Sequence, residues 1–511
     1  MPLSALTAEF LKQEHKLKEG GPAERQKKLN RLTVRERLAI LLDDPGEFFE
    51  IGLWAAYEMY KEYGELPAAG VVTGIGTVQG RSCMVIGNDA TVKAGAFFPQ
   101  SVKKVLRAQR IAFECRLPIL YLVDSSGVFL PLQEDIFPDE DDFGRIFRNN
   151  AVLSAQGIPQ FAAIMGNCIA GGGYLPVLCD QLLMTEGSGL YLAGPALVKA
   201  AIGQVVGTEE LGGAKMHASI SGTVDYLEKD DPSCLMKLRS LVSMLPEEKP
   251  LKSSKKTAPA LYDFLSVDGK KEYEIRDLLK WIVDEGSLIE YKAEYGQALF
   301  TGFATIGKQP VGIVANQRHP LTTGRGEIEI GGVIYADSAE KAARFVLECN
   351  QIHTPLLFFQ DVMGFMVGKQ AEASGIIKAG AKLVNAISNS IVPKITCILG
   401  NSFGAGHYAL CGKAYDPTFI IAWPSAKYAV MGGEQAKATL QAVQSKADPE
   451  VFEKLQKTYD RQMDIRYGAA RGWVDAIIDP AATPAILRKL LHWAVRKKHS
   501  QATLQTGVIQ L

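Results

Sequence analysis

The chain has 511 residues, which is long for one hydrophobic core and favours two domains of roughly 200 to 250 residues. Its hydrophobic fraction of 47% and charged fraction of 22% are typical of a globular protein, neither disordered nor embedded in a membrane. Basic and acidic residues each number 56, so the net charge is zero and gives no support for nucleic acid as a partner.

The eight cysteines are dispersed along the chain and form no CxxC or CxxH pair, so their spacing predicts no metal site. Most of them lie in apolar runs, as Cys397 does in ITCILGN, which indicates buried thiols in a reducing compartment. No apolar stretch reaches the roughly 18 to 20 residues that span a bilayer. Residues 1–21 also lack the pattern of a secretory or transit peptide, so the expected location is the cytoplasm.

The elements expected in the first half of the chain reappear, in the same order, in the second half. Each half is expected to contain a β-rich opening, an amphipathic helix, a strand, a further helix and a second strand. In the first half the opening, the amphipathic helix and the two strands lie at 71–89, 102–116, 118–124 and 159–167. In the second half they lie at 299–317, 339–352, 355–361 and 393–401. Short apolar strands that alternate with helices are typical of parallel sheets, which makes the predicted class α/β.

The spacing between matching residues indicates that the two halves are homologous domains. Three ordered matches fall at nearly one offset: 228 residues for Gly74 and Gly302, 237 for Asp124 and Asp361, and 234 for Gly166 and Gly400. A repeat of this length is the signature of a duplicated structural unit. The charged, apolar-poor segment 246–257 is the predicted linker, so the expected domains are residues 1–250 and 251–511.

Both halves end their second strand in a glycine-rich turn that precedes a predicted helix, CIAGGGY at 168–174 and SFGAGHY at 402–408. Glycine lets the backbone approach a ligand, and the first N–H groups of a helix have no partner within the helix. Such groups can stabilise a developing oxyanion. The alternative is that the glycines only give space for close packing of strand and helix. The presence of matching turns in both halves favours two similar sites that serve one reaction.

Longer stretches of both halves match the motifs of one known family. In the first half they include LTVRERLAILLDDP (32–45), NDATVKAGAFFPQSVKKVLRAQRIA (88–112) and YLVDSSGVFLPLQEDIFPD (121–139). In the second half they include LFTGFATIGKQPVGIVAN (299–316), GFMVGKQAEASGIIKAGAKLV (364–384) and VPKITCILGNSFGAG (392–406). From about residue 20 to 490 the chain thus resembles the carboxyltransferase (beta) subunits of biotin-dependent acyl-CoA carboxylases. The resemblance implies two crotonase-like domains in tandem, each a ββα superhelix of the ClpP/crotonase type.

The resemblance also implies a reaction and a role for each glycine turn. The family moves CO2 from carboxybiotin to the carbon of an acyl-CoA that has become an enolate, so two negative charges need hydrogen-bond donors. Domain 1–250 would bind the acyl-CoA, with Gly171 and Gly172 at the thioester oxygen. Domain 251–511 would bind biotin, with its carbonyl at Gly404, Ala405 and Gly406. In related enzymes the first site of one subunit faces the second site of another, which implies a homo-oligomer, expected to be a hexamer.

Further candidate binding residues lie near the turns and on the first amphipathic helix. Lys103, Lys104 and Arg107 are expected to meet the phosphates of coenzyme A, although a solvated helix face is a common fate for such a cluster. Residues next to the turns or in the motif GFMVG are expected to border the acyl or biotin pocket, with core packing as the alternative: Ala170, Phe403, His407, Gly364, Phe365 and Val367. No metal ligand is expected.

The chain carries no ATP-binding signature and no biotinylation site, so the resemblance implies a biotin carboxylase and a biotin carrier as partners. Biotin would be carried by the partner, and the CoA thioester would be the substrate. GFMVG and GNSFGAG favour the methylcrotonyl-CoA/geranyl-CoA branch, although Leu132 stands where that branch usually has arginine. AGGGY, IGGVIY and QDVMG also resemble the glutaconyl-CoA decarboxylase alpha subunit, a component of a membrane sodium pump that runs the reverse transfer. A different crotonase-fold enzyme, or a scaffold without chemistry, is the third alternative.

Overall fold

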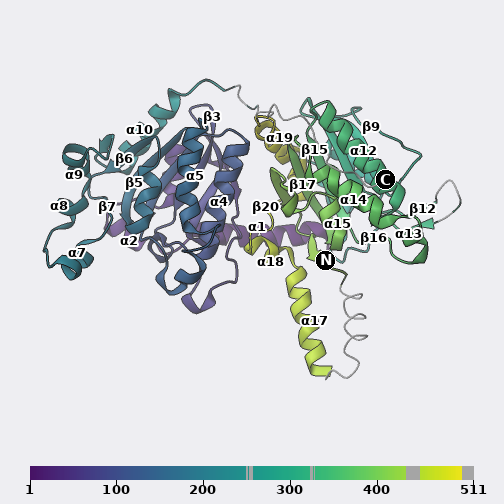
Figure 1. Ribbon diagram of the computed structural model, residues 1–511, viewed down its shortest axis with the longest axis horizontal. Helices are drawn as coiled ribbons and strands as arrows, with labels where there is room; N and C mark the ends of the chain where they lie inside the picture. The colour runs from purple at the N-terminus through teal and green to yellow at the C-terminus, as the bar shows by residue number, and fades with distance from the viewer. Residues whose placement is uncertain (249–250, 252–256, 323–325, 327, 433–448, 498–511) are drawn as a thin grey trace. The chain divides into compact units, whose positions relative to one another are not determined.

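The computed structural model describes residues 1–511 except 249–250, 252–256, 323–325, 327, 433–448 and 498–511 (Figure 1). The chain folds into two compact units. The N-terminal unit comprises Gln13–Pro250 and Ala470–Gly472, and the C-terminal unit comprises Met1–Lys12, Leu251–Ala469 and Trp473–Leu511. The change of unit after residue 250 falls inside the predicted linker, most of which lies outside the described residues. In the described part of the chain no helix is long and apolar enough to cross a bilayer.

The N-terminal unit is built on an eight-stranded sheet with the order β1-β2-β3-β4-β5-β6-β8, in which β7 also pairs with β5. Strands β1 to β3 are antiparallel, and every pairing from β3 onward is parallel. The strands are β1 (Phe49–Ile51), β2 (Val71–Val78), β3 (Arg81–Asn88), β4 (Ile119–Ser125), β5 (Gln160–Ile169), β6 (Gln181–Thr185), β7 (Gly189–Tyr191) and β8 (Tyr226–Glu228). The parallel core confirms the α/β class expected from the sequence.

Helices cover both faces of the N-terminal sheet. On one face, Leu38 and Leu238 belong to an apolar cluster with Leu120 of β4. On the other face, the Gln109 side chain donates a hydrogen bond of 3.0 Å to the Tyr121 hydroxyl. Because neighbouring residues of a strand point to opposite faces, β4 is covered on both sides. The helices of the unit are α2 (Glu24–Lys28), α3 (Val34–Leu41), α4 (Pro99–Glu114), α5 (Phe143–Ala155), α6 (Tyr174–Val177), α7 (Pro195–Ile202), α8 (Thr208–Gly212), α9 (Ala214–Met216) and α10 (Asp231–Ser243).

The C-terminal unit has a sheet of the same plan, with the order β20-β18-β17-β15-β11-β10-β9 and with β19 also paired to β17. Here too the opening strands are antiparallel and the following ones parallel. The main strands are β9 (Ile289–Glu290), β10 (Leu299–Ile306), β11 (Gln309–Asn316), β15 (Leu356–Val362), β17 (Lys394–Phe403), β18 (Phe419–Ala422), β19 (Lys427–Ala429) and β20 (Ala476–Ile477). Identical strand order in two units supports the homology that the sequence repeat predicts.

Short strands and further helices complete the C-terminal unit. The short strands are β12 (Leu321–Thr322), β13 (Ile328–Glu329), β14 (Val333–Ile334) and β16 (Gly364–Phe365). The helices are α11 (Ile275–Ile282), α12 (Ala336–Gln351), α13 (Lys369–Ala373), α14 (Ile376–Ser388), α15 (Gly404–Ala409), α17 (Pro449–Met463) and α19 (Thr483–Ala494). Two helices, α1 (Leu3–Glu19) and α18 (Ile465–Ala470), each contribute residues to both units.

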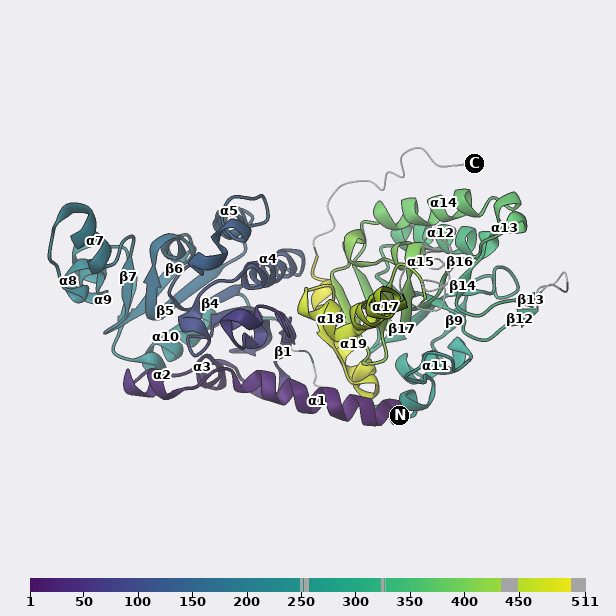
Figure 2. The same cartoon turned by 90° about the horizontal axis from the view of Figure 1, so that it is seen from below.

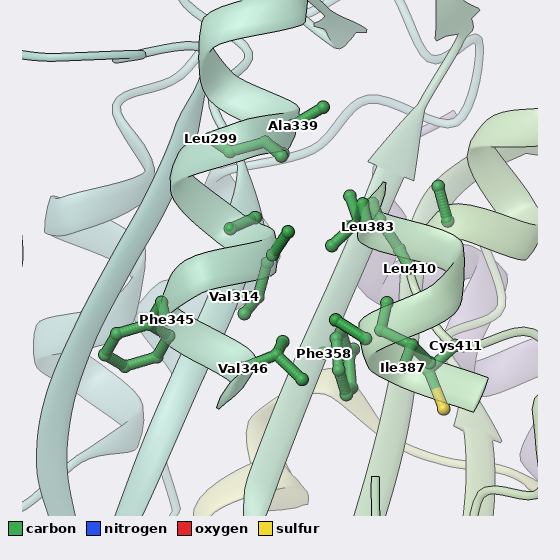
Figure 3. Close-up of a cluster of buried hydrophobic side chains, with 14 of the residues drawn as sticks. Leu299, Val314, Ala339, Phe345, Val346, Phe358, Leu383, Ile387, Leu410 and Cys411 are labelled. Carbon is green, nitrogen blue, oxygen red and sulfur yellow. The ribbon is translucent and has the colours of Figure 1, made fainter. Parts of the chain in front are cut away.

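The core of the C-terminal unit lies where α12 and α14 cover one face of its sheet (Figure 2). Figure 3 shows Val346 of α12 directed toward Phe358, and Phe345 of α12, Leu383 of α14 and Val314 belong to the same buried cluster. All five side chains are fully buried. Burying a side chain of this size contributes roughly 1.5–3 kcal/mol, so this cluster fixes how the two helices lie on the sheet.

The duplication extends to buried polar contacts at the starts of α4 and α12. Ser101 and Ser338 are the third residues of α4 and α12. The hydroxyl of each accepts a hydrogen bond from the N–H of the residue just before its helix. One turn later, Lys104 and Lys341 are buried and donate to backbone carbonyls near the starts of β2 and β10. Lys104 donates to Ala68 and to Val71, the first residue of β2, and Lys341 donates to Gly296. Burial lowers the pKa of Lys104 to about 7 and that of Lys341 to about 8.

Truncation of the buried Leu383 is expected to destabilise the C-terminal unit, whereas truncation of an exposed residue on the same helix is not. Leu383→Ala leaves a cavity between α12 and α14 and lowers the free energy of unfolding by about 2–5 kcal/mol. Ile377→Ala is the matched control, because Ile377 is 79% exposed, and it changes stability by less than about 0.5 kcal/mol. Urea unfolding of the full chain, followed by circular dichroism, measures both. Equal losses in the two variants would contradict this packing.

Candidate active site

Each glycine turn follows a strand that changes its pairing partner shortly before it ends. Strand β5 pairs with β6 as far as Ile164 and with β7 from Asn167 onward. Strand β17 pairs with β18 as far as Ile398 and with β19 from Asn401 onward. The two turns therefore lie at the carboxyl ends of parallel strands, the edge at which open α/β sheets bind their ligands.

The first turn, Ala170–Gly173, is a single 3-10 turn that leads into α6. A side chain on Gly172 would begin 3.9 Å from the Cα atom of Gly127, and a side chain on Gly127 would begin 3.2 Å from the carbonyl oxygen of Ile169. The backbone of the loop after β4, at Gly127, therefore lies against the backbone of this turn with no side chain between them. The placement of the Ala170 side chain lies outside what the structure describes.

The second turn opens α15, and its first residue, Gly404, has a φ of +54°. A Cβ atom there would lie 2.9 Å from the carbonyl oxygen of Val430, so both conformation and space favour glycine. Ala405, the next residue, is exposed. A Cβ atom on Gly406 would lie 3.3 Å from the Cα atom of Gly364. The structure thus brings Gly364, the first residue of GFMVG, against the second turn.

The other residues predicted around the second turn lie in different environments. Phe403 is buried, with 5% of its surface exposed, which favours core packing for its side chain, and its predicted place at the border of the pocket stays a prediction. Phe365 is half-buried and packs on α14, where a Cβ atom on Gly380 would lie 3.1 Å from its ring. Val367 is 77% exposed. Of the motif GFMVG, Gly364 and Val367 therefore stay candidates for a ligand contact.

His407 lies behind the second turn in a chain of polar side chains. Its Nδ1 atom is 2.8 Å from the hydroxyl of Ser402, which donates a 2.6 Å hydrogen bond to the Gln360 side chain. The Ser402 hydrogen is therefore used on Gln360, so Nδ1 of His407 carries the proton that it shares with Ser402. Burial lowers the pKa of His407 to about 4, so the ring is neutral at pH 7. Its predicted role as a biotin contact stays a prediction.

The three basic residues predicted for the CoA phosphates do not share one environment. Lys104 is buried with its ammonium on two backbone carbonyls, so it has no surface for a phosphate and that prediction is wrong. Lys103 is exposed at the surface. Its pKa is lowered first by partial desolvation among its neighbours and second by the positive charge of Arg471. A Cβ atom on Gly472 would lie 3.7 Å from Lys103. Lys103 and Arg107 stay candidates, and sequence reasoning missed Arg471 because it lies far along the chain.

Within the described residues, no group of three or more histidine, cysteine, aspartate or glutamate side chains is placed to hold a metal ion. The eight cysteines are free, and burial raises the pKa of several of them, including Cys168 to about 12. Neither nucleophilic cysteine chemistry nor a metal centre has support among these groups. The backbone turns stay the strongest candidates for chemistry.

Comparison with known proteins shows which family the chain belongs to. A family model described as the carboxyl transferase domain matches residues 25–509. The chain belongs to the carboxyl transferase family. It is 41% identical over 499 residues to a mitochondrial methylcrotonoyl-CoA carboxylase beta chain of Arabidopsis thaliana, covering 93% of this chain and 82% of the relative. It is 42% identical over 477 residues to a biotin-dependent 3-methylcrotonyl-coenzyme A carboxylase beta1 subunit of Mycobacterium tuberculosis, covering 89% and 87%.

A solved structure shows the same fold over the whole chain. The beta subunit of geranyl-CoA carboxylase from P. aeruginosa superimposes with a TM-score of 0.85 at 34% identity, covering 100% of this chain and 96% of that one. The expected family, the tandem crotonase-like fold and the enzyme class are confirmed. This carboxyltransferase is a beta subunit of the biotin-dependent acyl-CoA carboxylase class.

The buried, neutral His407 makes the stability of the carboxyltransferase depend on pH. Its folded pKa of about 4 lies below the unfolded value of about 6.5, so the unfolded chain takes up a proton first. The associated stability is present above pH 6.5 and is lost as the pH falls toward 4, by about 3 kcal/mol. His407→Gln is expected to flatten the difference in melting temperature between pH 7 and pH 5.

The matched control for that experiment is His15→Gln, because the His15 side chain is 84% exposed. Thermal melts at the two pH values, recorded for the full chain, compare the variants with the parent. If His407→Gln keeps the parent's pH dependence, the imidazole is not held neutral by burial.

Proposed function

We propose that this carboxyltransferase moves the carboxyl group of carboxybiotin, carried by a partner subunit, to 3-methylcrotonyl-CoA or a related branched, unsaturated acyl-CoA. Two curated relatives carry methylcrotonyl-CoA in their names, and the solved structure with the same fold is a geranyl-CoA carboxylase subunit. The motifs GFMVG and GNSFGAG favour the same branch. These observations favour a substrate whose carbon–carbon double bond is conjugated with the thioester and carries a branch at its β carbon.

The single observation that carries the mechanism is the repetition of one glycine turn at the same place in two sheets. In the proposed reaction the first turn donates the N–H groups of Gly171 and Gly172 to the thioester oxygen. The second turn, from Gly404 to Gly406, donates to the carbonyl oxygen of biotin. Each donor is backbone held by a sheet, so little reorganisation is needed as charge develops, and one such donor is typically worth about 2.7–4 kcal/mol of barrier.

The role of the chain in each step follows from these two turns. The first turn stabilises the enolate that the acyl-CoA becomes when it loses a proton. The second turn stabilises the negative charge that the ureido group gains when its bond to CO2 breaks. Biotin supplies the CO2 and, once freed of it, the base that accepts the proton of the acyl-CoA. The new carbon–carbon bond then forms between CO2 and the γ carbon of the resulting dienolate, which is the carbon that lost the proton. Because biotin accepts that proton, no side-chain base is required.

Lys103 and Arg107 of α4 are the proposed contacts of the CoA phosphates, with Arg471 as a third cation near Lys103. An exposed Lys103 suits this role because an ammonium binds phosphate as a compact point charge. Gly364 and Val367 are the proposed contacts at the border of the biotin site, because Gly364 lies against Gly406.

We also propose a homo-oligomer, in the form of a hexamer, that works with a biotin carboxylase and a biotin carrier. The support within this chain is apolar surface on the N-terminal unit, where residues after β7 expose large aliphatic side chains: Leu192, Leu197, Ile202, Val205 and Ile220. Monomeric proteins rarely leave such residues together in water. The cytoplasmic location stays a prediction.

The proposed function is tested by incubating the purified full chain with free biotin and a panel of carboxylated acyl-CoA esters. The reaction is reversible, so decarboxylation reports on the same two turns. We expect 3-methylglutaconyl-CoA to lose CO2 faster than malonyl-CoA, methylmalonyl-CoA or glutaconyl-CoA, measured by loss of the ester in chromatography. Failure with all four, in the presence and absence of a biotin carboxylase/carrier subunit, would refute the proposal. A sodium-dependent preference for glutaconyl-CoA would instead indicate the decarboxylase.

Placing a methyl group on the second turn is expected to lower the rate of transfer. Gly404→Ala forces a Cβ atom against the carbonyl of Val430, which displaces the N–H groups of the turn. Since a displacement on the order of 1 Å can cost about 100-fold, we expect kcat to fall at least tenfold. Gly286→Ala is the matched control, because Gly286 has a φ of +70° in the same unit and no atom within 4 Å of its Cβ position.

Both variants place alanine at a positive φ, so their comparison isolates the effect of the Cβ atom on the turn. Steady-state decarboxylation with free biotin gives kcat for each. Equal rates for Gly404→Ala and Gly286→Ala would show that the second turn does not take part.

A further inference from the structure

A buried carboxylate occupies the same place in both units, at the carboxyl end of the strand that lies next to the turn-bearing strand. Asp124 is the penultimate residue of β4 and is 5% exposed, and Asp361 is the penultimate residue of β15 and is 3% exposed. The proposed reaction uses neither of them. They are matched charged groups of the two units that lie beside the strands bearing the glycine turns.

Both carboxylates face an irregularity in the neighbouring strand. In the N-terminal unit, Val123 pairs with Ile164 and Ser125 pairs with Cys168, so three residues of β5 stand opposite the single Asp124. In the C-terminal unit the register shifts in the same way around Asp361, between the pairs Gln360–Ile398 and Val362–Ser402. Each strand therefore bulges at the point where it changes partner, immediately before its glycine turn.

The carboxylates hold these bulges by hydrogen bonds from the main chain. The N–H of Asn167 donates to Oδ1 of Asp124 at 3.3 Å, and the N–H of Asn401 donates to Oδ1 of Asp361 at 2.8 Å. The preceding residue is glycine in both strands. A Cβ atom on Gly166 would lie 2.0 Å from Cγ of Asp124, and one on Gly400 would lie 2.6 Å from Oδ1 of Asp361. Only glycine leaves space for the carboxylate inside the bulge.

The charge partners of the carboxylates come from unrelated parts of the two halves. Arg37 of α3 donates to Oδ2 of Asp124 at 3.3 Å and to the carbonyl of Met165 at 2.9 Å. Arg318, which follows β11, has its Nε atom 3.1 Å from Oδ2 of Asp361. Burial raises the pKa of both carboxyl groups, and the nearby arginine opposes the shift. The aspartate, the glycine and the bulge are thus common to both units, whereas the arginine is supplied differently.

We infer that Asp124 and Asp361 are matched positioning residues, each of which fixes the bulged strand segment and so directs the N–H groups of the glycine turn that follows. Asn167 and Asn401 lie only three to five residues before the N–H groups that the proposed function assigns to the thioester and to biotin. The inference rests on that assignment. An oxyanion site needs donors at about 2.7–3.1 Å from the charge that develops, so a small change in the direction of the strand reaches the chemistry.

A role in folding alone is the alternative, and the chain offers controls for it. Asp475 is 2% exposed and accepts hydrogen bonds from the N–H of Ile420 and from Lys413, at 2.8 and 3.0 Å. In the N-terminal unit, Asp43 accepts from the N–H groups of two residues of the turn after β2 and pairs with Arg239 at 2.8 Å. Both controls join a cation to backbone N–H groups, but neither faces a turn-bearing strand.

The test compares Asp124→Asn and Asp361→Asn with Asp43→Asn and Asp475→Asn in the full chain. Decarboxylation of 3-methylglutaconyl-CoA with free biotin gives kcat and KM. We expect kcat to fall at least tenfold in the first two variants, with each KM within threefold of the parent, because the lost stabilisation belongs to the transition state. The two controls are expected to keep kcat within twofold.

A spectroscopic measurement separates positioning from a loss of folded protein. The infrared carbonyl stretch of 3-methylcrotonyl-CoA, labelled with ¹³C at the thioester, falls in frequency when hydrogen-bond donors polarise the carbonyl. The shifted band therefore comes only from ester that is bound to folded protein. We expect Asp124→Asn to return the bound frequency toward that of the free ester, and Asp361→Asn to leave it unchanged. Gly166→Ala, which expels the carboxylate, should reproduce the first result, and it replaces Asp124→Asn if that variant does not fold.

The inference is overturned if the two aspartate variants match their controls in kcat, or if the carbonyl frequency in Asp124→Asn and Gly166→Ala equals that of the parent. Failure of the proposed function would be distinguished by the activity of the parent chain, which would then decarboxylate none of the esters.

Discussion

A single carboxylate wedged beside a bulged strand determines where each sheet ends and its glycine turn begins. The bulge lets β5 leave β6 for β7, and it lets β17 leave β18 for β19, so that the turn follows a strand held on new partners. A buried charge without a partner is costly, so each aspartate also requires an arginine in a fixed place. Arg37 connects α3 and the start of α10, through Asp231, to the edge of the sheet. Through Arg37, the position of the Asp124 carboxylate therefore also constrains α3 and α10 on the face of the N-terminal sheet.

The two units share this frame but differ behind the turn itself. In the C-terminal unit Gln360, Ser402 and His407 form a polar chain beneath the second turn. The registers of the two sheets place Val123 and Cys168 of the N-terminal unit where Gln360 and Ser402 stand. A polar chain with every partner satisfied holds its members in one arrangement, whereas apolar side chains at the same places set only shape. The two turns thus have different supports, in line with the proposal that one binds a thioester and the other a ureido group.

The sequence predicted the features of this chain that depend on local pattern. Alternation of short apolar runs and amphipathic helices gave the α/β units, and the glycines marked both turns, because periodicity and backbone freedom are visible within a few residues. The contacts that complete the site are not local. In the sequence, Asp124 and Asp361 are visible only as matching positions of the repeat. Their contacts with Arg37 and Arg318 could not be predicted, because these partners lie 87 and 43 residues away along the chain. The prediction that Lys104 contacts a phosphate failed for a related reason. Its position on an amphipathic helix does not reveal that its ammonium donates to the carbonyls of Ala68 and Val71, which lie more than 30 residues earlier in the chain.

The proposed use of backbone donors would allow relatives with the same reaction to differ in sequence around the turns. A side-chain catalyst would fix the identity of particular residues, but an N–H group is supplied by any residue that can adopt the turn. What must persist is the direction of the strand that carries it, and here that direction depends on the carboxylate and on the glycine that makes space for it. Relatives that are 41% and 42% identical over most of their length can therefore share the chemistry. Side chains around the turns are then free to change with the acyl group, so substrate choice evolves without disturbing the donors.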